Sequence, residues 1–437
     1  MTGNRSYDAI IIGAGIVGAN LGFEMSKAGY KTVNVDKLPA AGYGSTANSC
    51  AIVRTHYSTW AGVAMAYEGF HYWKDWDNYL EVDDERGTAA FVQCGGVYVG
   101  NDQRYSEKVL PLFDEIGIEY EIWDVDQLIR RLPGIDIGDH SPPKRPEDDA
   151  FWEEPSQQIT SAVYTPIAGY ITDPQLAAHN LQRAAEAKGG EFLFRVEVTG
   201  IRIEDGRVAG VELANGNSID APIVVNVAGP HSFVINEMAG VADSMRIKTR
   251  ALRHEVHHVP SPDNIDFEQD GMLVGDDDLG TYFRPEVGNH ILVGSQDPDC
   301  DPKIWVEDPD DFDHNITADQ WQAQVLRLAR RLPALGVPSD RKGVVDLYDV
   351  SDDWIPIYDT SDLPGFYLAI GTSGNQFKNS HIAAYCVTKL IQAVEAGHDH
   401  DRDPLRVTMP HTGLELDMSV FSRNREINAA SSFSVLG

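Results

Sequence analysis

The chain is poor in cysteine and in basic residues, and it lacks any long apolar run. Its 437 residues include four cysteines, Cys50, Cys94, Cys300 and Cys386, which lie far apart and form no C-x-x-C pair. This argues against a metal cluster and a disulfide framework, and it predicts a reducing, cytoplasmic compartment. Because the apolar runs are short and interrupted, no membrane span is expected. A strand that begins at Ala9 leaves no room for a signal peptide.

Positive charge is scarce relative to negative charge. The chain has 35 Lys and Arg residues and 67 Asp and Glu residues, which gives a formal charge of −32. A field of this sign repels nucleic acid and anionic membranes, so neither is expected as a partner. Such acidity is also compatible with a salt-rich environment. The acidic runs Asp83–Glu85, Asp276–Asp278 and Asp310–Asp311 are expected in solvated loops.

The start of the chain has the spacing of a dinucleotide-binding loop. A buried strand is expected over Ala9–Ile12, and Gly13, Gly15 and Gly18 follow it as G-x-G-x-x-G. In this motif the first glycine allows a tight turn, the second lets the backbone approach a pyrophosphate, and the third lets helix pack on strand. The diphosphate then lies at a helix N-terminus, where free N–H groups and the helix dipole favour negative charge.

The residues after this loop complete a βαβ unit. A helix is expected to end near Gly29, and a second strand over Thr32–Val35 leads into Asp36. An acid at that place can accept hydrogen bonds from a ribose. Because strand, helix, strand and acid are all in register, a dinucleotide site is the preferred interpretation. A βαβ unit with a glycine-rich turn and no ligand is the alternative.

Cap and turn residues predict how the chain continues. Asp173 followed by Pro174 is typical of a helix start, and this helix is expected to reach about Lys188. The stretch Val63–Leu80 has helical spacing. A β-meander with Asp-Gly and Asn-Gly turns is expected to follow, with strands over Phe192–Ile203, Arg207–Leu213 and Asn217–Ile219.

The last third of the chain returns to the pattern of its start. Residues 250–300 are expected to be rich in strands, and a helix is expected over 318–331. Gly365–Lys378 is again a strand, a glycine turn and a helix start. Two interleaved domains therefore fit better than two consecutive ones. The expected nucleotide-binding domain comprises residues 1–90, 156–232 and 341–437, and the expected substrate-binding domain comprises residues 91–155 and 233–340.

Together these motifs resemble the FAD-dependent oxidoreductases of the D-amino-acid-oxidase and sarcosine-oxidase type, over nearly the whole length. The resemblance implies an α/β fold in which a Rossmann-like FAD-binding domain is interleaved with an α+β substrate domain built on an antiparallel sheet. The segments that carry the resemblance are the G-x-G-x-x-G loop, Gly44–Thr46, Ile52–Tyr57, Ile171–Pro174, Val225–Gly229 and Gly371–Lys378.

The resemblance also implies where FAD is bound. The diphosphate is expected on the first helix, the ribose on Asp36, the adenine at the Val198 backbone, and the flavin near the last glycine turn. A helix N-terminus at that turn would stabilise the negative charge of the reduced flavin. The residues assigned to the cofactor in this way are Gly13, Gly15, Ile16, Val17, Gly18, Asp36, Lys37, Ser45, Thr46, Val198, Ala228, Gly229, Gly371, Gly374, Asn375, Gln376, Phe377 and Lys378.

Substrate binding is expected to depend on two cations. Arg54 matches an arginine that relatives use to bind a substrate carboxylate, and Lys378 matches a lysine that assists it. A guanidinium fork suits a planar carboxylate, whereas an ammonium is a point charge. Surface salt bridging is the alternative for both. Tyr348 and Tyr282 match tyrosines near the substrate in relatives, with ordinary aromatic packing as the alternative. His56 is a candidate base only through its proximity to Arg54.

Three departures from the family pattern refine the expectation. Relatives with covalently linked flavin carry cysteine where this chain has Asp346, or histidine where it has Thr46, so FAD is expected to be non-covalent. The usual His-Gly pair of the last glycine turn is Asn375-Gln376 here. Leu292 occupies the place of a lysine that oxygen-using relatives need, which favours a dehydrogenase.

The expected function is FAD-dependent oxidation of the C–N bond of a small N-methylated amino acid such as sarcosine or dimethylglycine. Hydride would pass to the flavin, and water would hydrolyse the imine. The electron acceptor would be oxygen or a redox carrier, and homo- or hetero-oligomers are both open. The alternatives are a 2-hydroxy acid dehydrogenase and the flavin subunit of a multi-subunit amine oxidase. Residues 421–437 would contact a partner or be disordered.

Overall fold

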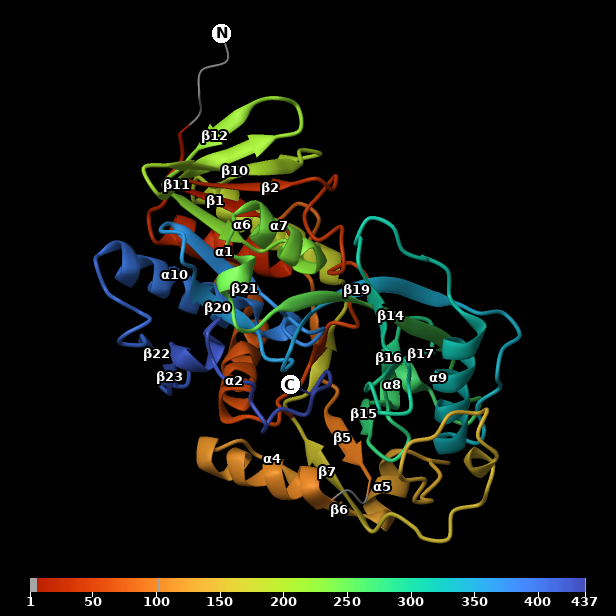
Figure 1. Cartoon of the computed structure of the whole chain (residues 1–437). Coiled ribbons are helices and arrows are strands. Elements are labelled where there is room, and N and C mark those ends of the chain that lie inside the picture. Colours follow the sequence, from red (N-terminus) through yellow and green to blue (C-terminus); the bar gives the residue numbers. More distant parts are fainter. Residues whose placement is uncertain (1–5, 101–102, 437) are drawn as a thin grey trace.

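The computed structural model describes residues 6–100 and 103–436, and within these ranges two large sheets dominate the molecule (Figure 1). Residues 1–5 and 437 of the predicted nucleotide-binding segments lie outside the described residues. Chain segments far apart in sequence alternate between the two sheets. In Figure 1 the label of the C-terminus lies between them.

The first sheet is the predicted nucleotide-binding sheet. Its central strand β1 pairs in parallel with β2 on one side and with β13 on the other, for example Ile10 with Val33 and with Val224. Only the edge pair β20–β21 is antiparallel among its described pairs. The strands lie in the order β20 (Ile357–Thr360), β21 (Phe366–Ile370), β13 (Ile223–Asn226), β1 (Ala9–Ile12), β2 (Thr32–Asp36) and β9 (Glu191–Phe194).

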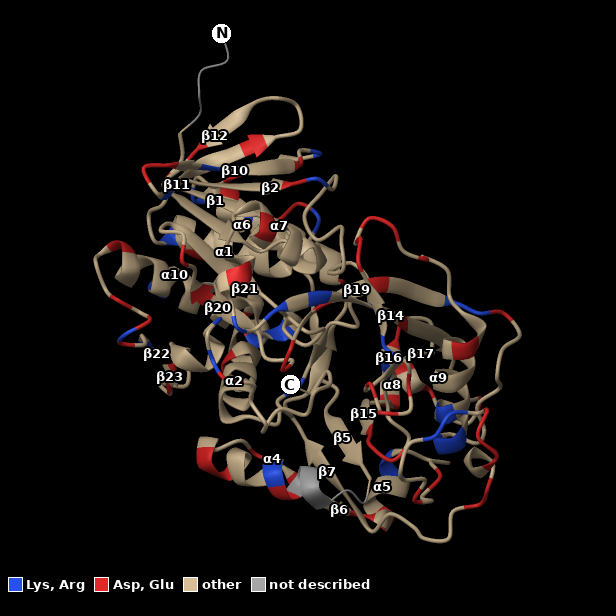
Figure 2. Cartoon of the chain, in the orientation of Figure 1, with Lys and Arg blue, Asp and Glu red and all other residues tan. Residues whose placement is uncertain are grey.

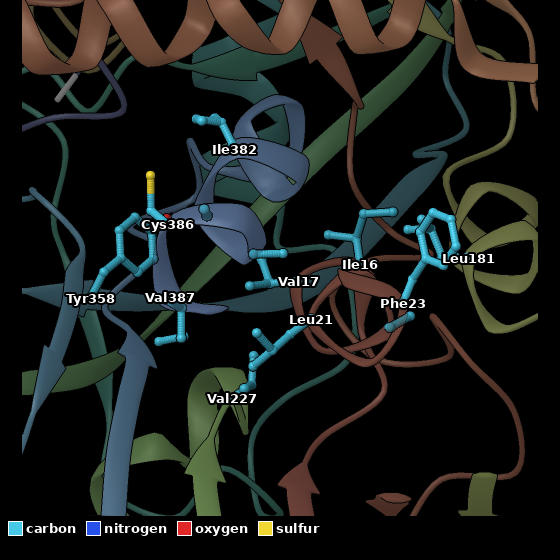
Figure 3. Close-up of a cluster of buried hydrophobic side chains, with 14 of the residues drawn as sticks. Ile16, Val17, Leu21, Phe23, Leu181, Val227, Tyr358, Ile382, Cys386 and Val387 are labelled. Carbon is cyan, nitrogen blue, oxygen red and sulfur yellow. The ribbon is translucent and has the colours of Figure 1, made fainter. Parts of the chain in front are cut away.

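Three helices pack together on this sheet. Helix α1 (Ile16–Lys27) lies between α6 (Pro174–Ala187) and α10 (Ser380–Glu395). Because α1 meets the sheet and both helices, its side chains are buried almost all around from Ile16 to Ser26. Figure 3 shows its residues between Leu181 of α6 and Cys386 and Val387 of α10. The first helix is therefore fixed by apolar packing on all sides.

The helix predicted after Asp173 is confirmed. The Asp173 side chain accepts a hydrogen bond from the Leu176 N–H, and Pro174 occupies the first helical position of α6. The helical stretch predicted over Val63–Leu80 consists of two helices, α2 (Trp60–Lys74) and α3 (Trp76–Leu80), which are separated at Asp75.

The strand predicted over Phe192–Ile203 is wrong as a single strand. Arg195 has φ of 59°, a left-handed conformation, and the chain changes sheet there. The part before Arg195 is β9, which extends the parallel sheet beside β2. The part after it begins a separate antiparallel sheet of β10 (Val198–Glu204), β11 (Arg207–Leu213) and β12 (Ser218–Asp220). The apolar pattern continues across the turn because both strands are partly buried.

The second large sheet is mixed and largely antiparallel, as expected for the substrate side, with β5 and β15 paired in parallel. Helix α9 (Ala318–Arg331) contacts it and has the predicted bounds. The described strands are β18 (Ile304–Val306), β14 (Thr249–Pro260), β17 (His290–Ser295), β16 (Thr281–Glu286), β15 (Leu273–Asp276), β5 (Gly96–Val99), β7 (Ser161–Thr165), β6 (Glu121–Asp124) and β19 (Gly343–Ser351), which pairs with β14. Two of these strands, β7 and β19, belong to segments assigned above to the other domain, and the boundaries stay a prediction.

Shorter elements connect the two sheets. A small antiparallel sheet consists of β3, β8 and β4, with β8 in the middle. The remaining elements are β3 (Ile52–Val53), β4 (Phe91–Val92), α4 (Gln103–Ile116), α5 (Val125–Arg131), β8 (Gly169–Ile171), α7 (Ser232–Met238), α8 (Phe267–Asp270), β22 (Arg406–Thr408), β23 (Glu415–Asp417) and the short 3₁₀ turns 149–151, 229–231, 242–244, 377–379 and 418–421.

The acidic residues are not all solvated as predicted. Figure 2 shows Asp and Glu on loops around both sheets, and Asp310 and Asp311 are exposed. Asp276 and Asp278, however, are buried, because Arg331 of α9 binds them: its Nε lies 2.6 Å from Asp276 Oδ2 and its Nη2 lies 3.6 Å from Asp278 Oδ2. For this run the expectation of a solvated loop is wrong.

Two further expectations concern the whole chain. None of the helices in the described ranges combines the length and the apolar character needed to cross a bilayer. All four cysteines are free thiols, as the absence of a disulfide framework predicts.

Candidate functional site

The G-x-G-x-x-G loop is closely packed against backbone. Gly13 has φ of 120°, and a Cβ on it would lie 2.3 Å from the Val227 carbonyl oxygen. A Cβ on Gly18 would lie 2.4 Å from the carbonyl oxygen of Gly13. Gly15 is different, because a Cβ there would meet only the Thr46 hydroxyl at 3.1 Å. Gly13 and Gly18 are therefore required for packing, whereas Gly15 leaves a small open cradle in front of α1.

Two polar side chains of β2 fix the loop. Asn34 Nδ2 donates to the carbonyls of Gly13 and Gly18, at 2.9 and 2.8 Å. Asp36 accepts from the N–H of Ala14, at 2.8 Å, and burial raises the pKa of its carboxyl. The role of Asn34 was missed by the sequence reasoning, although an asparagine inside a buried strand was the available signal.

This loop fits the diphosphate of a dinucleotide. Helix α1 begins at Ile16, and its N-cap residue, Gly15, has no side chain that could cap the helix. The Ile16 N–H donates to the Thr46 hydroxyl at 3.0 Å, which places Thr46 at the helix N-terminus. A helix N-terminus without a capping acid, next to a cradle that a Cβ would fill, is suited to an anion.

The other residues predicted for the adenosine half lie around the same end of the sheet. Val196 N–H donates to the Asp36 carbonyl at 3.1 Å, just before β10 begins at Val198. Ala228 and Gly229 follow β13 beside Gly13. Lys37 Nζ lies 2.6 Å from Asp310 Oδ2 of the substrate-side region and 3.0 Å from His231 Nε2, in the turn that begins at Gly229.

The loop of Ser45 joins the two sheets. Ser45 Oγ donates to Asp346 Oδ1 at 3.0 Å and to the Leu347 carbonyl at 2.8 Å. Asn48 Nδ2 donates to Asp346 Oδ2 at 2.6 Å. Asp346 belongs to β19, so the predicted flavin loop is tied directly to the edge of the substrate-side sheet.

A buried carboxyl orders the second glycine turn. Asp349 of β19 accepts from the Gly371 N–H at 2.6 Å and from the Ser232 hydroxyl at 2.8 Å. Burial raises the pKa of Asp349 to about 7. Its role was missed by the sequence reasoning, because an acid in a strand with other acids nearby gives no distinctive signal.

The rest of this turn packs into the molecule. A Cβ on Gly374 would lie 2.4 Å from the Tyr348 ring. Gln376 Oε1 accepts from Tyr358 at 3.2 Å, and the Phe377 ring stacks on Trp73 with centroids 5.5 Å apart. Helix α10 begins directly afterwards at Ser380, as the strand–turn–helix pattern predicts.

The two predicted cations meet at Tyr57. The Arg54 guanidinium lies over the Tyr57 ring, 4.8 Å from its centroid. Lys378 Nζ donates to the Tyr57 hydroxyl at 2.8 Å and to the Asn375 carbonyl at 2.7 Å. Arg54 is 8% exposed and Lys378 is 4% exposed, so the alternative of surface salt bridges is wrong. Tyr57 closes the predicted motif Ile52–Tyr57, but its bridging role was not predicted.

Burial shapes the protonation of this cluster. Desolvation and the neighbouring Arg54 charge hold the pKa of Lys378 well below its usual range. Burial raises the pKa of Tyr57 to about 12. Burying both groups as cations is costly, and an entering anion would relieve that cost.

The predicted tyrosines form a second cluster. Burial raises the pKa of both Tyr282 and Tyr348, and Cys50 Sγ lies 3.4 Å from Tyr282 Oη. The His254 ring stacks on Tyr348 with centroids 4.1 Å apart. His254 Nε2 lies 2.8 Å from Asp297. Because Tyr348 also touches the glycine turn at Gly374, this cluster is adjacent to the predicted flavin region.

His56 has a packing role. Its ring stacks on Tyr98 with centroids 3.3 Å apart, and its carbonyl accepts a hydrogen bond from Arg54 Nη1. Burial and the Arg54 charge hold the pKa of His56 well below its usual range.

The C-terminal segment also reaches this site. Val435 is 6% exposed, and its carbonyl accepts from Arg54 Nη2 at 2.6 Å. The expectation that this segment is disordered is therefore wrong for residues 421–436, and contact with a partner stays a prediction. Gly437 lies outside the described residues.

Comparison with known proteins gives a family match over most of the chain. The family model described as FAD dependent oxidoreductase matches residues 8–390. This range includes both glycine turns, Arg54 and Lys378, but not the segment at Val435.

Individual relatives are distant. Human mitochondrial sarcosine dehydrogenase is 26% identical over 67% of this chain, which spans only 30% of that relative's length. Sarcosine oxidase subunit beta of Rhodobacter capsulatus is 26% identical over 89% of this chain and 85% of its own length. The crystal structure of L-proline dehydrogenase from P. horikoshii has the same fold, with a TM-score of 0.73, 19% identity, and coverage of 90% of this chain and 94% of that one.

Proposed function

Since the chain belongs to the FAD dependent oxidoreductase family, we propose that it oxidises the C–N bond of a small N-methylated amino acid such as sarcosine or dimethylglycine. The observation that carries the proposal is the buried pair Arg54 and Lys378, joined by Tyr57. Two cations shielded from water are suited to a carboxylate. The names of the sarcosine-oxidising relatives support the choice of an amino acid.

In this proposal the substrate carboxylate takes the place of neutral partners of the cations. The donors of Arg54 are bonded to the carbonyls of His56 and Val435, and one donor of Lys378 is bonded to Asn375. A carboxylate is a stronger acceptor than a carbonyl, because its charge strengthens each hydrogen bond. Its arrival would also raise the pKa of Lys378, which favours the charged ammonium.

The residues around the glycine turns would bind and orient the cofactor. Bound FAD would supply the two-electron oxidation, which leaves an imine for water to hydrolyse. Gly15, the start of α1 and Asp36 would bind the dinucleotide, and the Gly371 turn would be held in shape by Asp349. Tyr282 and Tyr348 would line the substrate side.

We also propose that FAD is bound non-covalently. Asp346 and Thr46 stand at the two linkage positions of relatives, and both are engaged in hydrogen bonds, to Ser45 and to the Ile16 N–H. Acid precipitation should release the yellow flavin into the supernatant. Flavin that stays with the pellet would contradict the proposal.

The substrate is tested by anaerobic bleaching of the flavin. Sarcosine, dimethylglycine, glycine, proline and lactate would be mixed with the holoenzyme, and the fall in flavin absorbance would be followed. We expect the N-methylated amino acids to bleach it fastest. Faster bleaching by lactate would establish the 2-hydroxy acid alternative instead.

The electron acceptor is a separate question. Leu292 of β17 lies opposite His258 and Arg284 in the sheet, and a leucine cannot stabilise developing superoxide. We therefore propose that a redox carrier is preferred over oxygen. Stopped-flow reoxidation in air at a rate that matches turnover would contradict this dehydrogenase assignment.

A second candidate is a flavin-bearing subunit of a larger assembly. The similarity to the R. capsulatus beta subunit covers most of both chains and favours this possibility. Native mass measurement together with an activity assay on the isolated chain separates the two. A chain that is active alone would exclude an obligatory partner.

A further inference from the structure

The segment Ser431–Leu436 crosses the site of Arg54. Its Val435 carbonyl accepts a hydrogen bond from Arg54 Nη2 at 2.6 Å. The Ser432 N–H donates to the Ser58 hydroxyl at 3.1 Å, and the Leu436 carbonyl accepts from the Ser58 N–H at 3.3 Å. In Figure 1 the C-terminal label lies in the middle of the view, between the labels of α2 and β15. The segment thus lies beside Ser58, a few residues after Arg54 in sequence.

Apolar packing attaches the other side of the segment to the substrate-side sheet. Val435 belongs to a buried cluster with Leu252 of β14, Val350 of β19 and Trp354, and Tyr348 packs against the same cluster. The segment therefore lies between the cation that would bind the carboxylate and the tyrosine proposed to line the substrate.

The chain before the segment is firmly anchored. Arg425 donates to both oxygens of the buried Asp353, at 2.7 and 2.9 Å, and the Asn428 N–H lies 3.3 Å from the same carboxylate. Between this anchor and Val435, the Phe433 side chain is 39% exposed. The segment is thus a short length of chain that is held at Asp353 before it begins and at Arg54 and the Val435 cluster near its end.

We propose that Ser431–Leu436, which we call the strap, closes the substrate site and competes with the substrate carboxylate for Arg54. This inference rests on the proposed function for the identity of the competitor. The strap offers Arg54 a neutral carbonyl, which keeps the guanidinium hydrogen-bonded while no substrate is present. A carboxylate offers a charged acceptor in the same place and displaces the strap.

The first test needs no catalytic activity. Hydrogen exchange of the amides of residues 428–436 would be measured by mass spectrometry in the FAD-loaded wild type and in Arg54→Ala. Loss of a hydrogen bond to a charged group should speed exchange of the strap by about tenfold or more. Arg207→Ala is the matched control, because Arg207 pairs with Glu395 on a different part of the surface and should leave the strap unchanged. Equal exchange in wild type and Arg54→Ala would overturn the seating on Arg54.

The second test measures competition. Val435→Ser removes a buried apolar anchor, whereas Phe433→Ser removes an exposed apolar side chain of the same segment. If a closed strap lowers the fraction of competent enzyme, Val435→Ser should lower the KM by about threefold or more with kcat unchanged. Phe433→Ser should leave both constants near wild type.

The outcomes separate this inference from the proposed function. A KM that stays the same or rises in Val435→Ser, while strap exchange becomes faster, would overturn the competition. If none of the tested amino acids bleaches the flavin, the proposed function fails, and the exchange experiment still decides whether the strap is seated on Arg54. In that case acetate is the competing probe: faster strap exchange in acetate supports displacement by a carboxylate, and slower or equal exchange overturns it.

Discussion

The nucleotide side and the substrate side of this molecule are built by different means. Around Gly13 and Gly18 the close contacts are made with backbone atoms, either by other backbone atoms or by the Asn34 side chain, and all come from β1, α1, β2 and the end of β13. Around Arg54 the contacts are made by long side chains, to the Tyr57 ring and to backbone carbonyls, and the groups that meet there, Lys378 and Val435, come from distant parts of the chain. The first site leaves no room for an added atom at Gly13 or Gly18, and the second depends on the charge and reach of a few groups.

This difference predicts two kinds of sensitivity. Changes on the nucleotide side should affect folding and cofactor content together, because the loop is part of the packing of α1. Changes on the substrate side should affect affinity for the substrate and leave the cofactor in place. The following variants test that separation, beginning with the one expected to have the largest effect.

Gly13→Ala should abolish FAD binding and destabilise the fold by more than about 3 kcal/mol. The added methyl group would lie 2.3 Å from the Val227 carbonyl oxygen. Gly29→Ala is the matched control, because Gly29 also has positive φ, 92°, but has no atom within 4 Å of the added Cβ. The control should cost only about 1–2 kcal/mol of backbone strain. Flavin absorbance measures FAD binding, and urea unfolding measures the stability of the fold. Equal losses in Gly13→Ala and Gly29→Ala would show that lack of room for the added Cβ is not the cause.

Arg54→Ala should lower kcat/KM for the carboxylate substrate by an amount that corresponds to about 2–4 kcal/mol of lost transition-state binding. The change should come mainly from a higher KM. The flavin content should remain that of the wild type. Arg207→Ala removes an arginine of the partly exposed pair with Glu395 and should change little. Steady-state kinetics with the substrate found by bleaching decide the matter. Kinetics of Arg54→Ala close to wild type would refute the carboxylate site.

Tyr57→Phe should have a smaller effect of the same kind, a loss of about 1 kcal/mol in kcat/KM. The ring that supports Arg54 is kept, and only the hydroxyl that accepts from Lys378 is lost. Tyr57→Leu removes the ring as well and should cost more. If Tyr57→Phe were as damaging as Arg54→Ala, the hydroxyl would have a chemical role beyond positioning Lys378.

Asp349→Asn should change how the free energy of unfolding depends on pH. Burial raises the pKa of Asp349 from 3.8 to about 7 in the folded protein. Between these values the folded state holds a proton that the unfolded state releases, so this group stabilises the fold on the acid side. The contribution is lost as pH rises through about 7. Urea unfolding at pH 5 and pH 8 should therefore differ less in Asp349→Asn than in wild type, and an equal difference in both proteins would contradict the assignment.

The same contrast explains what the sequence could predict. The nucleotide loop lies in 30 consecutive residues whose glycine spacing is dictated by backbone geometry, so its strands, helix and acid were predicted nearly to the residue. The helices after Asp173 and over 318–331 followed from capping residues and apolar periodicity.

The substrate side was predicted only through resemblance. Arg54 and Lys378 were named, but Tyr57, which joins them, lies 321 residues from Lys378 in sequence. Arg54 and Val435 are 381 residues apart. No local pattern encodes such a contact. The wrong predictions have a similar cause: Asp276 and Asp278 looked like loop acids because their partner Arg331 is remote, and the Phe192–Ile203 strand looked continuous because both halves are partly buried.

The order of strands in the first sheet also sets when the protein can acquire its cofactor during synthesis. β1 and β2 leave the ribosome early, yet the other neighbour of β1, strand β13, is more than 200 residues further along. At about 5–20 residues per second, the open edge of β1 waits roughly 10–40 seconds for its partner. The carbonyl of Val227 that encloses Gly13 is made only then. The enclosed form of the glycine loop can therefore exist only after β13 has been made, and until then one edge of β1 has no strand beside it.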